Sequence, residues 1–528
     1  VFTKGTSLIK SLTRYSGTEN EEKALDTFTY NALGNQIKTV THFNYIADSL
    51  KSSVTYKNSN ATATTAGTLN PTASDAAWTA ALDQVYTQGP KKSLTNYSGD
   101  QGEEIAKITL NYNSLEQVKT TTVFDYNPDN SLKRSTTYRN VNADTGNLDP
   151  KDATKFILFD ATLGNAKIRS VSDYSGDQGE EKALVTHNYN FAGDKVKTAT
   201  VFSYTADTLT QSVTYRNDVF LADAKAGTLK STDTMRSKTE YSGFEGEEKA
   251  LRTLNYGSDG QTVKSTTVFI YMQDALRVSL TYRGEASVEG FKAEALSVSP
   301  SPSPQASAAP IQERASLKSR TSYQGFEGEE KAIVTINYDS TGQMIKSYTR
   351  FSYTHDALTQ SITYRESGIK RSETDYFGSE GEEKALRTLN YSSNGQTVKS
   401  TTVFRYTQDT LTESFTYRGE ASVEGLSVSP SPSPSASAAP VQEERASLRS
   451  RTSYQGFEGE EKARITLNYN SLGNIKTTTV FDYNADDSLK TSSTYRAVNA
   501  TTGNVDATGL VFTKGTSLIK SLTRYSGT

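Results

Sequence analysis

Apolar and polar residues alternate with a period of two along most of the chain. In one stretch, two successive segments place an apolar or threonine side chain at every second position: Ala106, Ile108, Leu110 and Tyr112, then Val118, Thr120, Thr122, Phe124 and Tyr126. Short alternating runs rich in Thr, Tyr, Val and Phe, bounded by Gly, Asn, Asp and Ser, are typical of β-strands. In the first such group we expect strands at residues 7–15, 23–31, 37–45 and 50–57.

Tyrosine marks a repeat. An anchor tyrosine, followed at the second position by Gly, opens each of seven repeats, and a Lys or Arg follows each of these anchors at one constant distance; Tyr525 opens the next period. The segment from a cation to the next anchor varies in length, from the short 365–376 to the long 57–97 and 283–323, so the segment of constant length is the structural unit. The seven pairs of anchor and cation are Tyr15 and Lys57, Tyr97 and Arg139, Tyr174 and Arg216, Tyr241 and Arg283, Tyr323 and Arg365, Tyr376 and Arg418, and Tyr454 and Arg496.

Three further tyrosines follow the anchor within each repeat, and in repeat one they are Tyr30, Tyr45 and Tyr56. Their spacing is the same in five repeats, whereas repeats two and seven shorten the second interval by one residue and lengthen the third by one. A slip of one residue turns every side chain of a strand to the wrong face, so antiparallel strands in fixed register require such compensation. We therefore expect an all-β fold with four antiparallel strands in each repeat and a structural core that includes Tyr112, Phe124, Tyr126 and Tyr138.

These positions divide the chain into repeats and joints. We expect 1–57 (repeat one), 58–89 (joint), 90–139 (repeat two), 140–166 (joint), 167–216 (repeat three), 217–233 (joint), 234–283 (repeat four), 284–315 (Ser/Pro-rich joint), 316–365 (repeat five), 366–418 (repeat six), 419–446 (Ser/Pro-rich joint), 447–496 (repeat seven), 497–510 (joint) and 511–528 (start of the next period). The last segment is identical to residues 1–18, so one period comprises residues 1–510. We interpret the chain as one window of a tandem array; an artificially added duplicate is the alternative.

Glycine predicts the turns. One Gly lies at the second position after each anchor, at Gly17, Gly99, Gly176, Gly243, Gly325, Gly378 and Gly456. A second Gly follows three positions later in six repeats, and the exception is Asn20. Asn tolerates positive φ better than most non-Gly residues, so the pattern indicates a left-handed turn position.

A single repeat is too small to be stable alone. Below about 70–80 residues one apolar core seldom provides enough stabilisation. Neighbouring repeats must therefore bury its remaining face and edges, as in solenoid proteins. We expect the repeats to stack into an open, continuous fibre or β-spiral. A seven-bladed β-propeller is the alternative, because seven units of four strands also fit that architecture.

The amino-acid composition limits the classes of function that we expect. The 528 residues include 57 Lys plus Arg and 60 Asp plus Glu, and the net charge of −3 provides no basic field for nucleic acid. The chain has no Cys and no apolar run long enough to span a bilayer, which argues against disulfides, thiolate chemistry and a membrane-spanning helix. His42, His187 and His355 fall at different offsets in their repeats, and common catalytic motifs are absent. We expect neither an enzyme nor a bound cofactor.

One acidic motif recurs in every repeat: two adjacent glutamates shortly after the anchor, such as Glu103 with Glu104 and Glu180 with Glu181. Paired carboxylates beside a Gly turn are suited to Ca²⁺. Ionic ladders between repeats are the alternative, because each repeat also has its terminal cation and a lysine in its third strand. These lysines are Lys38, Lys119, Lys197, Lys264, Lys346, Lys399 and Lys476.

Two segments depart from the repeat pattern. Residues 297–310 (SVSPSPSPQASAAP) and 427–440 (SVSPSPSPSASAAP) alternate Ser with Pro. Pro lacks the backbone N–H of a ladder and favours polyproline II, so we expect exposed spacers. Their composition also suits O-glycosylation, and possible N-glycosylation sequons lie in the joints at residues 60–62 and 499–501.

Three segments resemble a known signature. Residues 469–475 (YNSLGNI), 30–35 (YNALGN) and 338–343 (YDSTGQ) are similar to the Tyr-Asp/Asn-x-x-Gly-Arg/Asn-Leu/Ile motif of RHS or YD-repeat proteins. The resemblance implies a long bacterial surface or secreted chain whose strands wind into a continuous β-spiral. This chain departs from the pattern in its uneven tyrosine spacing, in lacking Arg after the Gly, and in containing no toxin or core-processing segment. The family's toxin-encapsulating role is therefore not inferred.

Two classes of function remain. The first is an extracellular filament, sheath or cell-surface stalk, whose partners are copies of the same chain joined covalently or end to end. The second is a cell-surface adhesin or β-propeller that binds glycans or proteins. The internal repetition, the Ser/Pro spacers and the abundance of Thr, Ser and Tyr favour the first class.

Overall fold

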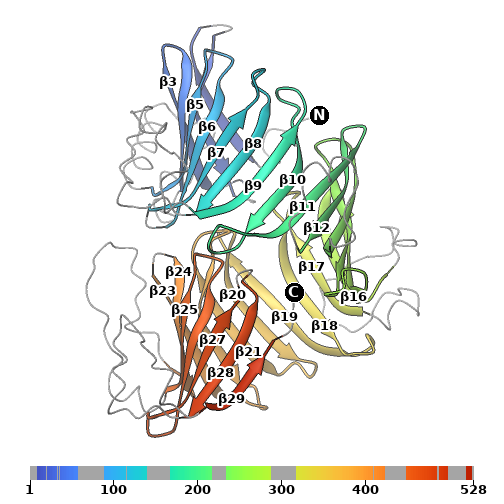
Figure 1. Cartoon of the computed structure of the whole chain (residues 1–528), viewed down its shortest axis with the longest axis vertical. Coiled ribbons are helices and arrows are strands. Elements are labelled where there is room, and N and C mark those ends of the chain that lie inside the picture. Colours follow the sequence, from blue (N-terminus) through green and yellow to red (C-terminus); the bar gives the residue numbers. More distant parts are fainter. Residues whose placement is uncertain are drawn as a thin grey trace. The chain divides into compact units, whose positions relative to one another are not determined.

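The fold was analysed from a computed structural model. It describes residues 9–18, 21–31, 34, 36–57, 89–114, 116–139, 167–216, 234–286, 317–407, 409–421, 448–484, 487–496 and 519–525. These residues form 29 β-strands and no helix, which confirms the expected all-β class (Figure 1). The chain divides into two compact units, with the boundary between Lys195 and Val196.

The first unit contains ten strands. They are β1 (Ser11–Ser16), β2 (Lys23–Tyr30), β3 (Ile37–Ile46), β4 (Ser49–Lys57), β5 (Lys91–Ser98), β6 (Ile105–Tyr112), β7 (Val118–Tyr126), β8 (Leu132–Arg139), β9 (Lys167–Ser175) and β10 (Lys182–Tyr189). In repeat one the four strands lie close to the ranges expected from the alternation, because the pattern and the turn residues agree there.

The second unit contains the other described strands. They are β11 (Val196–Thr205), β12 (Thr208–Tyr215), β13 (Met235–Ser242), β14 (Lys249–Tyr256), β15 (Val263–Met272), β16 (Ala275–Arg283), β17 (Leu317–Gln324), β18 (Lys331–Tyr338), β19 (Ile345–Thr354), β20 (Ala357–Arg365), β21 (Lys370–Phe377), β22 (Lys384–Tyr391), β23 (Val398–Thr407), β24 (Thr410–Arg418), β25 (Leu448–Gln455), β26 (Lys462–Tyr469), β27 (Ile475–Tyr483), β28 (Leu489–Arg496) and β29 (Ile519–Arg524).

Within each unit, every strand pairs with the strand that follows it in the sequence, and all of these pairings are antiparallel. The ladder of the first unit runs from β1 to β10. That of the second unit runs from β11 to β29. In the described part of each unit the first strand does not pair with the last, so neither ladder closes on itself.

The ladder continues from one repeat to the next. The last strand of repeat one, β4, pairs with the first strand of repeat two, β5, as regularly as β5 pairs with β6. The pairs β8–β9, β12–β13, β16–β17, β20–β21 and β24–β25 do the same. Blades of a propeller are separate sheets around a central channel, so the propeller alternative does not describe this chain. Strand pairing therefore joins successive repeats in an open, unclosed sheet, which confirms the expected open β-repeat fold.

Each signature tyrosine lies at a break in the register. In repeat two the pairing shifts by one residue beside Tyr97, Tyr112, Tyr126 and Tyr138. The equivalent shifts recur in the other repeats. A β-bulge bends its strand and increases the local twist. The fixed tyrosine spacing therefore marks where the sheet bends, which alternation alone does not show.

The most deeply buried apolar side chains gather on one face of the sheet. Where repeat one meets repeat two they form a cluster from the three strands β4, β5 and β6, with partly buried Tyr112 and Val123 packed against it. The cluster consists of Val54, Leu94, Ile108 and Leu110. Each of these side chains is at most 9% exposed. Aliphatic residues of strands one, two and four thus occupy the most protected positions of this part of the sheet.

The four residues expected in the structural core occupy different surroundings. Tyr112 packs against the aliphatic cluster, whereas Phe124 points to the opposite face, because its neighbour Val123 packs on the cluster and successive side chains alternate. Tyr126 donates a hydrogen bond from its hydroxyl to the carbonyl of Ala106 at 2.7 Å. Tyr112, Phe124, Tyr126 and Tyr138 are all half-buried. In repeat two these four aromatic side chains are therefore less deeply buried than the aliphatic cluster.

The opposite face is held by paired hydroxyl groups. Thr95 lies beside Thr109, and Thr122 beside Thr137, with 2.9 Å between the side-chain oxygens in each pair. Equivalent pairs, one of them between Ser172 and Thr186, recur in every repeat at 2.7–3.0 Å. Cross-strand hydroxyl pairs stabilise a sheet, and they account for the high Thr content.

The turns use the expected glycines at positive φ. The seven glycines that follow the anchors have φ between 115° and 148°. A Cβ atom at Gly99 would lie 2.4 Å from the carbonyl oxygen of Glu103, whereas a Cβ at Gly102 would meet open space. The hairpin between strands three and four is a two-residue turn with both φ angles positive, such as 45° and 66° at Ala206 and Asp207, which is typical of type I′.

Repeats two and seven use different turn lengths. In repeat two, Asn113 N–H donates to the carbonyl of Gln117. The corresponding bond in repeat one spans one residue more, from Asn31 to Gln36. The later hairpin of repeat two is longer and closes from Asn127 to Ser131. The ladder between them keeps its alternation.

Several sequence features lie outside the described residues. They include most of the six joints, the Ser/Pro segments 297–310 and 427–440, both sequons and Asn20. In the described part of the chain, no helix has the length and apolar character needed to cross a membrane.

We predict that Gly99→Val disrupts the hairpin between β5 and β6. The new side chain would require φ near 121° and would collide with the Glu103 carbonyl, a cost of about 2–4 kcal/mol. Hydrogen exchange measured by mass spectrometry should show faster exchange in β5 and β6. The control Gly102→Asn places a side chain in open space at a φ that Asn tolerates. Equal exchange in the two variants would contradict the turn geometry.

Candidate functional site

The most regularly repeated polar residues meet where one repeat joins the next. We call this region the junction: the fourth strand of one repeat, together with the first two strands of the following repeat. Three contacts recur there, and each connects residues of two successive repeats. The junction is therefore the candidate functional site of the chain.

The first contact joins the anchor tyrosine to a serine of the preceding repeat. The Tyr97 hydroxyl lies 3.1 Å from Ser53 Oγ, and the Tyr174 hydroxyl lies 3.2 Å from Ser135 Oγ. The same contact, at 3.0–3.2 Å, joins Ser212 with Tyr241, Ser279 with Tyr323, Ser361 with Tyr376, Ser414 with Tyr454 and Ser492 with Tyr525. Every anchor from Tyr97 onward thus contacts the repeat before it.

The second contact uses the second glutamate of each pair. Leu50 N–H donates to Glu104 Oε1 at 2.9 Å, and Gly102 N–H donates to Oε2 at 2.8 Å. The carboxylate therefore joins its own turn to the start of β4 in the preceding repeat. Equivalent bonds of 2.7–2.9 Å join Leu132 to Glu181, Leu209 to Glu248, Leu276 to Glu330, Leu358 to Glu383 and Leu411 to Glu461.

The third contact uses the terminal arginine. Arg418 donates from Nη1 to the carbonyl of Leu448 at 2.6 Å and from Nη2 to the carbonyl of Tyr469 at 2.8 Å. Both carbonyls belong to the next repeat. The same pairs of bonds link Arg139 to Ile168 and Tyr189, Arg216 to Met235 and Tyr256, Arg283 to Leu317 and Tyr338, and Arg365 to Lys370 and Tyr391.

The three contacts are distributed along the whole junction. In β8, Leu132, Ser135 and Arg139 stand at the start, the middle and the end of the strand. Each of them contacts the following repeat, in addition to the ladder between β8 and β9. Strand four is therefore held to the next repeat along its full length.

Hydrogen bonding and burial shift the pKa values of ionisable side chains at the junction and of nearby tyrosines. The hydrogen bond from the Leu50 amide is the main reason that the pKa of Glu104 lies below its usual value of 4.5. Burial raises the pKa of Tyr112 to about 12. It also raises the pKa of Tyr126 to about 12, with a smaller effect from the charge of Glu181. At neutral pH the glutamate is therefore an anion that accepts hydrogen bonds, and these tyrosines are neutral.

The calcium candidates lie at the tips of two hairpins. Both oxygens of Glu104 accept backbone N–H groups, and so do both oxygens of Glu181. Glu103 and Glu180 are exposed beside them. Among the described residues, no group of three or more His, Asp or Glu side chains is arranged to hold a metal ion. Calcium binding stays a prediction that would use Glu103 and Glu180 first.

Ion pairs also connect repeats, but through residues other than those expected. Lys384 Nζ lies 2.9 Å from Asp409 in its own repeat and 3.3 Å from Glu458 in the next. Lys249 makes the same two contacts, at 2.6 Å with Asp274 and 3.1 Å with Glu327. The terminal arginines bind carbonyl groups and the second glutamates bind amides, so the expected ladder between these two sets does not form at the described junctions.

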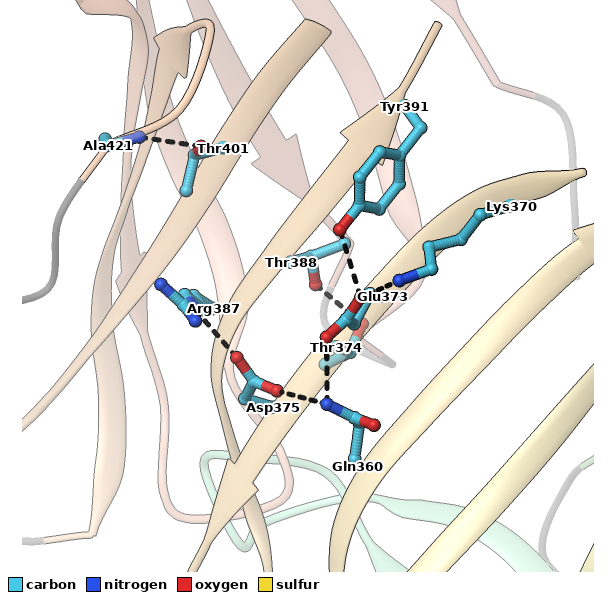
Figure 2. A network of polar contacts seen from close by, with 10 residues as sticks. All are labelled: Gln360, Lys370, Glu373, Thr374, Asp375, Arg387, Thr388, Tyr391, Thr401 and Ala421. Carbon is cyan, nitrogen blue, oxygen red and sulfur yellow. Dashed lines mark hydrogen bonds and ion pairs between the residues drawn. The ribbon is translucent and has the colours of Figure 1, made fainter. Parts of the chain in front are cut away.

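The junction between repeats five and six carries an additional polar network (Figure 2). Glu373 accepts hydrogen bonds from Lys370 Nζ at 2.8 Å, Gln360 Nε2 at 2.9 Å and the Tyr391 hydroxyl at 3.0 Å. Asp375 accepts from Gln360 at 3.1 Å and from Arg387 at 2.7 Å. This junction has the shortest joint, and its side chains satisfy one another across three strands.

The histidines are not brought together. His42 in β3 contacts Asp26 at 2.8 Å, His187 lies in β10, and His355 occupies a turn with φ of 50°. Asp26 is also 3.7 Å from Arg14. Each histidine has its own local surroundings, as their unequal offsets suggested.

Sequence reasoning identified one member of each junction contact and missed the other. The serine partner keeps a fixed distance from the anchor of its own repeat, as Ser53 does from Tyr15 and Ser135 from Tyr97, and so does the leucine of the second contact. The sequence therefore shows that the serine and the leucine are repeated positions. It does not show which groups contact the glutamate and the arginine, because both bind backbone groups, which leave no signature in the sequence.

Comparisons with known proteins do not identify a family for this chain. No protein-family model matches the chain. No curated protein matches it either. Two crystal structures, TcdB2-TccC3 and TcdB2-TccC3-Cdc42, align with TM-scores of 0.28 at 10% and 9% identity. Each alignment covers 93% of this chain, which spans only 22% and 21% of those chains.

Two further solved structures show weaker similarity. The Tc holotoxin pore of Photorhabdus luminescens aligns with a TM-score of 0.21 at 9% identity, covering 89% of this chain and 21% of that one. A porin-like protein from Bacteroides uniformis aligns with a TM-score of 0.17 at 10% identity, over 62% and 88% of the two chains. TM-scores this low do not establish a common fold. The chain is defined by its own structure as an all-β tandem-repeat protein.

We predict that Glu104→Gln weakens the junction between repeats one and two. The folded-state pKa of Glu104 is depressed, so its stabilising contribution is present above about pH 4.5 and is lost as the pH falls through the folded value. The protection factor of the β4 amides, which is the exchange rate measured by mass spectrometry relative to the intrinsic rate at the same pH, should fall on acidification in the wild type. In Glu104→Gln this protection should be lower already at pH 7 and should depend less on pH. Glu103→Gln, which alters an exposed carboxylate, should match the wild type; equal effects of both changes would contradict the assignment.

We predict that Arg418→Met destabilises the junction between repeats six and seven by about 1–3 kcal/mol, the usual range for hydrogen bonds to a charged donor. Hydrogen exchange in β25 and β26 should increase because both carbonyl partners lose their donor. Lys399→Met removes an exposed cation of the same repeat and serves as control. The contact has no energetic role if exchange in Arg418→Met equals that of the control.

Proposed function

We propose that this chain is a structural protein of an extracellular filament, sheath or cell-surface stalk. The supporting observation is that the junctions reuse one set of contacts: the serine–tyrosine contact recurs at every described junction, and all three contacts occur at the five junctions that follow Arg139, Arg216, Arg283, Arg365 and Arg418. A contact set that recurs at each step allows repeats to be added in series without a change in geometry. Such an arrangement suits a load-bearing or spacing element better than a single binding or catalytic centre.

The pairing of β29 supports the same proposal. Residues 519–524 have the sequence of residues 9–14, and they pair with β28 of repeat seven. Tyr525 lies 3.2 Å from Ser492, and its N–H donates to the carbonyl of Lys490 at 3.0 Å. The other copy of this sequence, in β1, pairs with β2 through its opposite edge. One strand sequence therefore serves both sides of a junction, as a tandem array requires.

A cell-surface adhesin that binds glycans or proteins is the second candidate. Its support is that every joint follows a fourth strand and precedes a first strand. All joints therefore connect to the sheet at the same end of the strands. Segments of variable length on a constant scaffold commonly carry binding functions. A structural array that displays its joints combines both roles.

Electron microscopy of arrays with one, two and three copies of the period 1–510 tests the structural role. We expect elongated particles whose length rises in proportion to the number of periods, because each repeat adds the same strands to an open sheet. Particles of compact shape, with a diameter that grows only as the cube root of mass, would contradict the proposal.

A further inference from the structure

Each repeat carries rows of like charge at the two ends of its strands, in addition to charges within the strands. The turns between strands one and two, and between strands three and four, lie at one end of the strands. Strand two turns into strand three at the opposite end, where strand four also ends. We call the first row of strand ends the acidic edge and the second row the basic edge, after the side chains that they carry. Both edges run through every repeat.

The basic edge carries two rows of cations. One row stands at the fifth position before each anchor: Lys10, Lys92, Arg169, Arg236, Lys318, Arg371 and Arg449. The second row is the set of third-strand lysines, of which Lys197, Lys264, Lys346, Lys399 and Lys476 are exposed. All members of the first row are exposed as well. The five exposed lysines form no ion pair with any residue that the structure describes.

The acidic edge carries the glutamate pairs and the aspartates of the strand three to four turns. In repeat six this edge contains Glu380, Glu382, Glu383 and Asp409, with Lys384 as the cation. The basic edge of the same repeat contains Lys370, Arg371, Lys399 and Arg418, with Glu366 and Glu420 as the carboxylates. Each edge therefore has an excess of its own sign.

The two edges are too far apart to neutralise each other. A strand of eight or nine residues, at about 3.3 Å per residue, separates them by roughly 25–30 Å. The Debye length is about 8 Å at physiological ionic strength. Each edge thus presents its own potential to the surroundings.

We propose that the acidic edge of one copy of this chain docks side by side against the basic edge of a second copy. This inference rests on the structural role proposed above. Both charge rows repeat every four strands, about 19 Å at the usual spacing between strands. A second copy is the partner whose charges match this spacing at every repeat, because its rows lie on the same sheet geometry. A soluble polyion or an unrelated protein has no reason to share that period.

Repetition makes the contact measurable and sensitive to salt. A single exposed ion pair contributes little to binding, but within each unit successive repeats carry the same charged positions. Screening weakens all of them together. Side-by-side association is therefore expected at low ionic strength and should disappear when salt is added.

Sedimentation of the full chain in 20 mM and in 500 mM NaCl tests the inference. Larger, concentration-dependent species are expected at the lower salt only. If wild-type chain sediments as the same species at both salt concentrations, the inference is rejected; this is also the result expected if carboxylates of the chain's own joints already neutralise the basic edge.

Two matched variants distinguish pairing between the acidic and basic edges from a general effect of net charge. Lys92→Glu with Lys476→Glu reverses two cations of the basic edge in repeats two and seven. Lys133→Glu with Lys490→Glu makes the same change of charge at exposed positions of the acidic edge in the same repeats. The first variant should raise the apparent dissociation constant about tenfold, while the second should associate at least as well as the wild type. Equal weakening in both variants would show a generic charge effect and overturn the proposal.

A mixing experiment tests the partner directly. Glu103→Lys with Glu180→Lys reverses two exposed carboxylates of the acidic edge. This variant and the basic-edge variant should each self-associate weakly, and a mixture should regain association because reversed edges face each other. Failure of the mixture to associate would reject docking between copies. Elongated particles in the same samples would leave the structural role intact, whereas compact particles would reject it.

Discussion

The antiparallel ladder that crosses every junction is the interaction on which the rest of this structure depends. A four-stranded repeat by itself exposes two strand edges, and each edge presents unpaired N–H and C=O groups. In this chain the fourth strand of one repeat and the first strand of the next satisfy each other. No repeat is therefore a closed unit, and the stability of each one includes that of its neighbours, as in other repeat proteins.

The side chains that recur most regularly strengthen that ladder. The serine and tyrosine pair, the glutamate and the arginine are placed along the length of strand four, as Ser135, Glu181 and Arg139 show. Two of the three bind backbone groups, so they hold the chain without depending on the identity of the facing side chain. This tolerance explains how junctions with joints of very different length keep one geometry. The network around Glu373 is an addition at a single junction.

Much of the fold could be predicted from the sequence, because strands, turns and register each produce a regular spacing of residue types. Alternation located the four strands of repeat one, and the Gly positions marked turns whose φ values are positive. The sequence also indicated that neighbouring repeats cover each other's edges, but it did not identify which strands pair across a junction, since the repeat period is the same for any such pairing. The bulges at the tyrosines were missed because a one-residue shift in pairing does not alter the spacing of the residues themselves.

The candidate site was predictable only in part. Glu104 was identified as a repeated carboxylate, but its partners are the amides of Leu50 and Gly102, which any residue could supply. The separation of charge between the two edges was present in the sequence as two rows of cations and one of acids. It became visible only when the structure placed these rows at opposite ends of the strands.

Unfolding by urea of fragments with one, two, three and seven repeats, beginning with residues 90–139 as the single repeat, tests most directly whether neighbours stabilise one another. The account predicts that the single repeat is unfolded in water and that the midpoint of unfolding rises with each added repeat until it levels off. A single repeat that folds cooperatively, with the same midpoint as the seven-repeat chain, would contradict it.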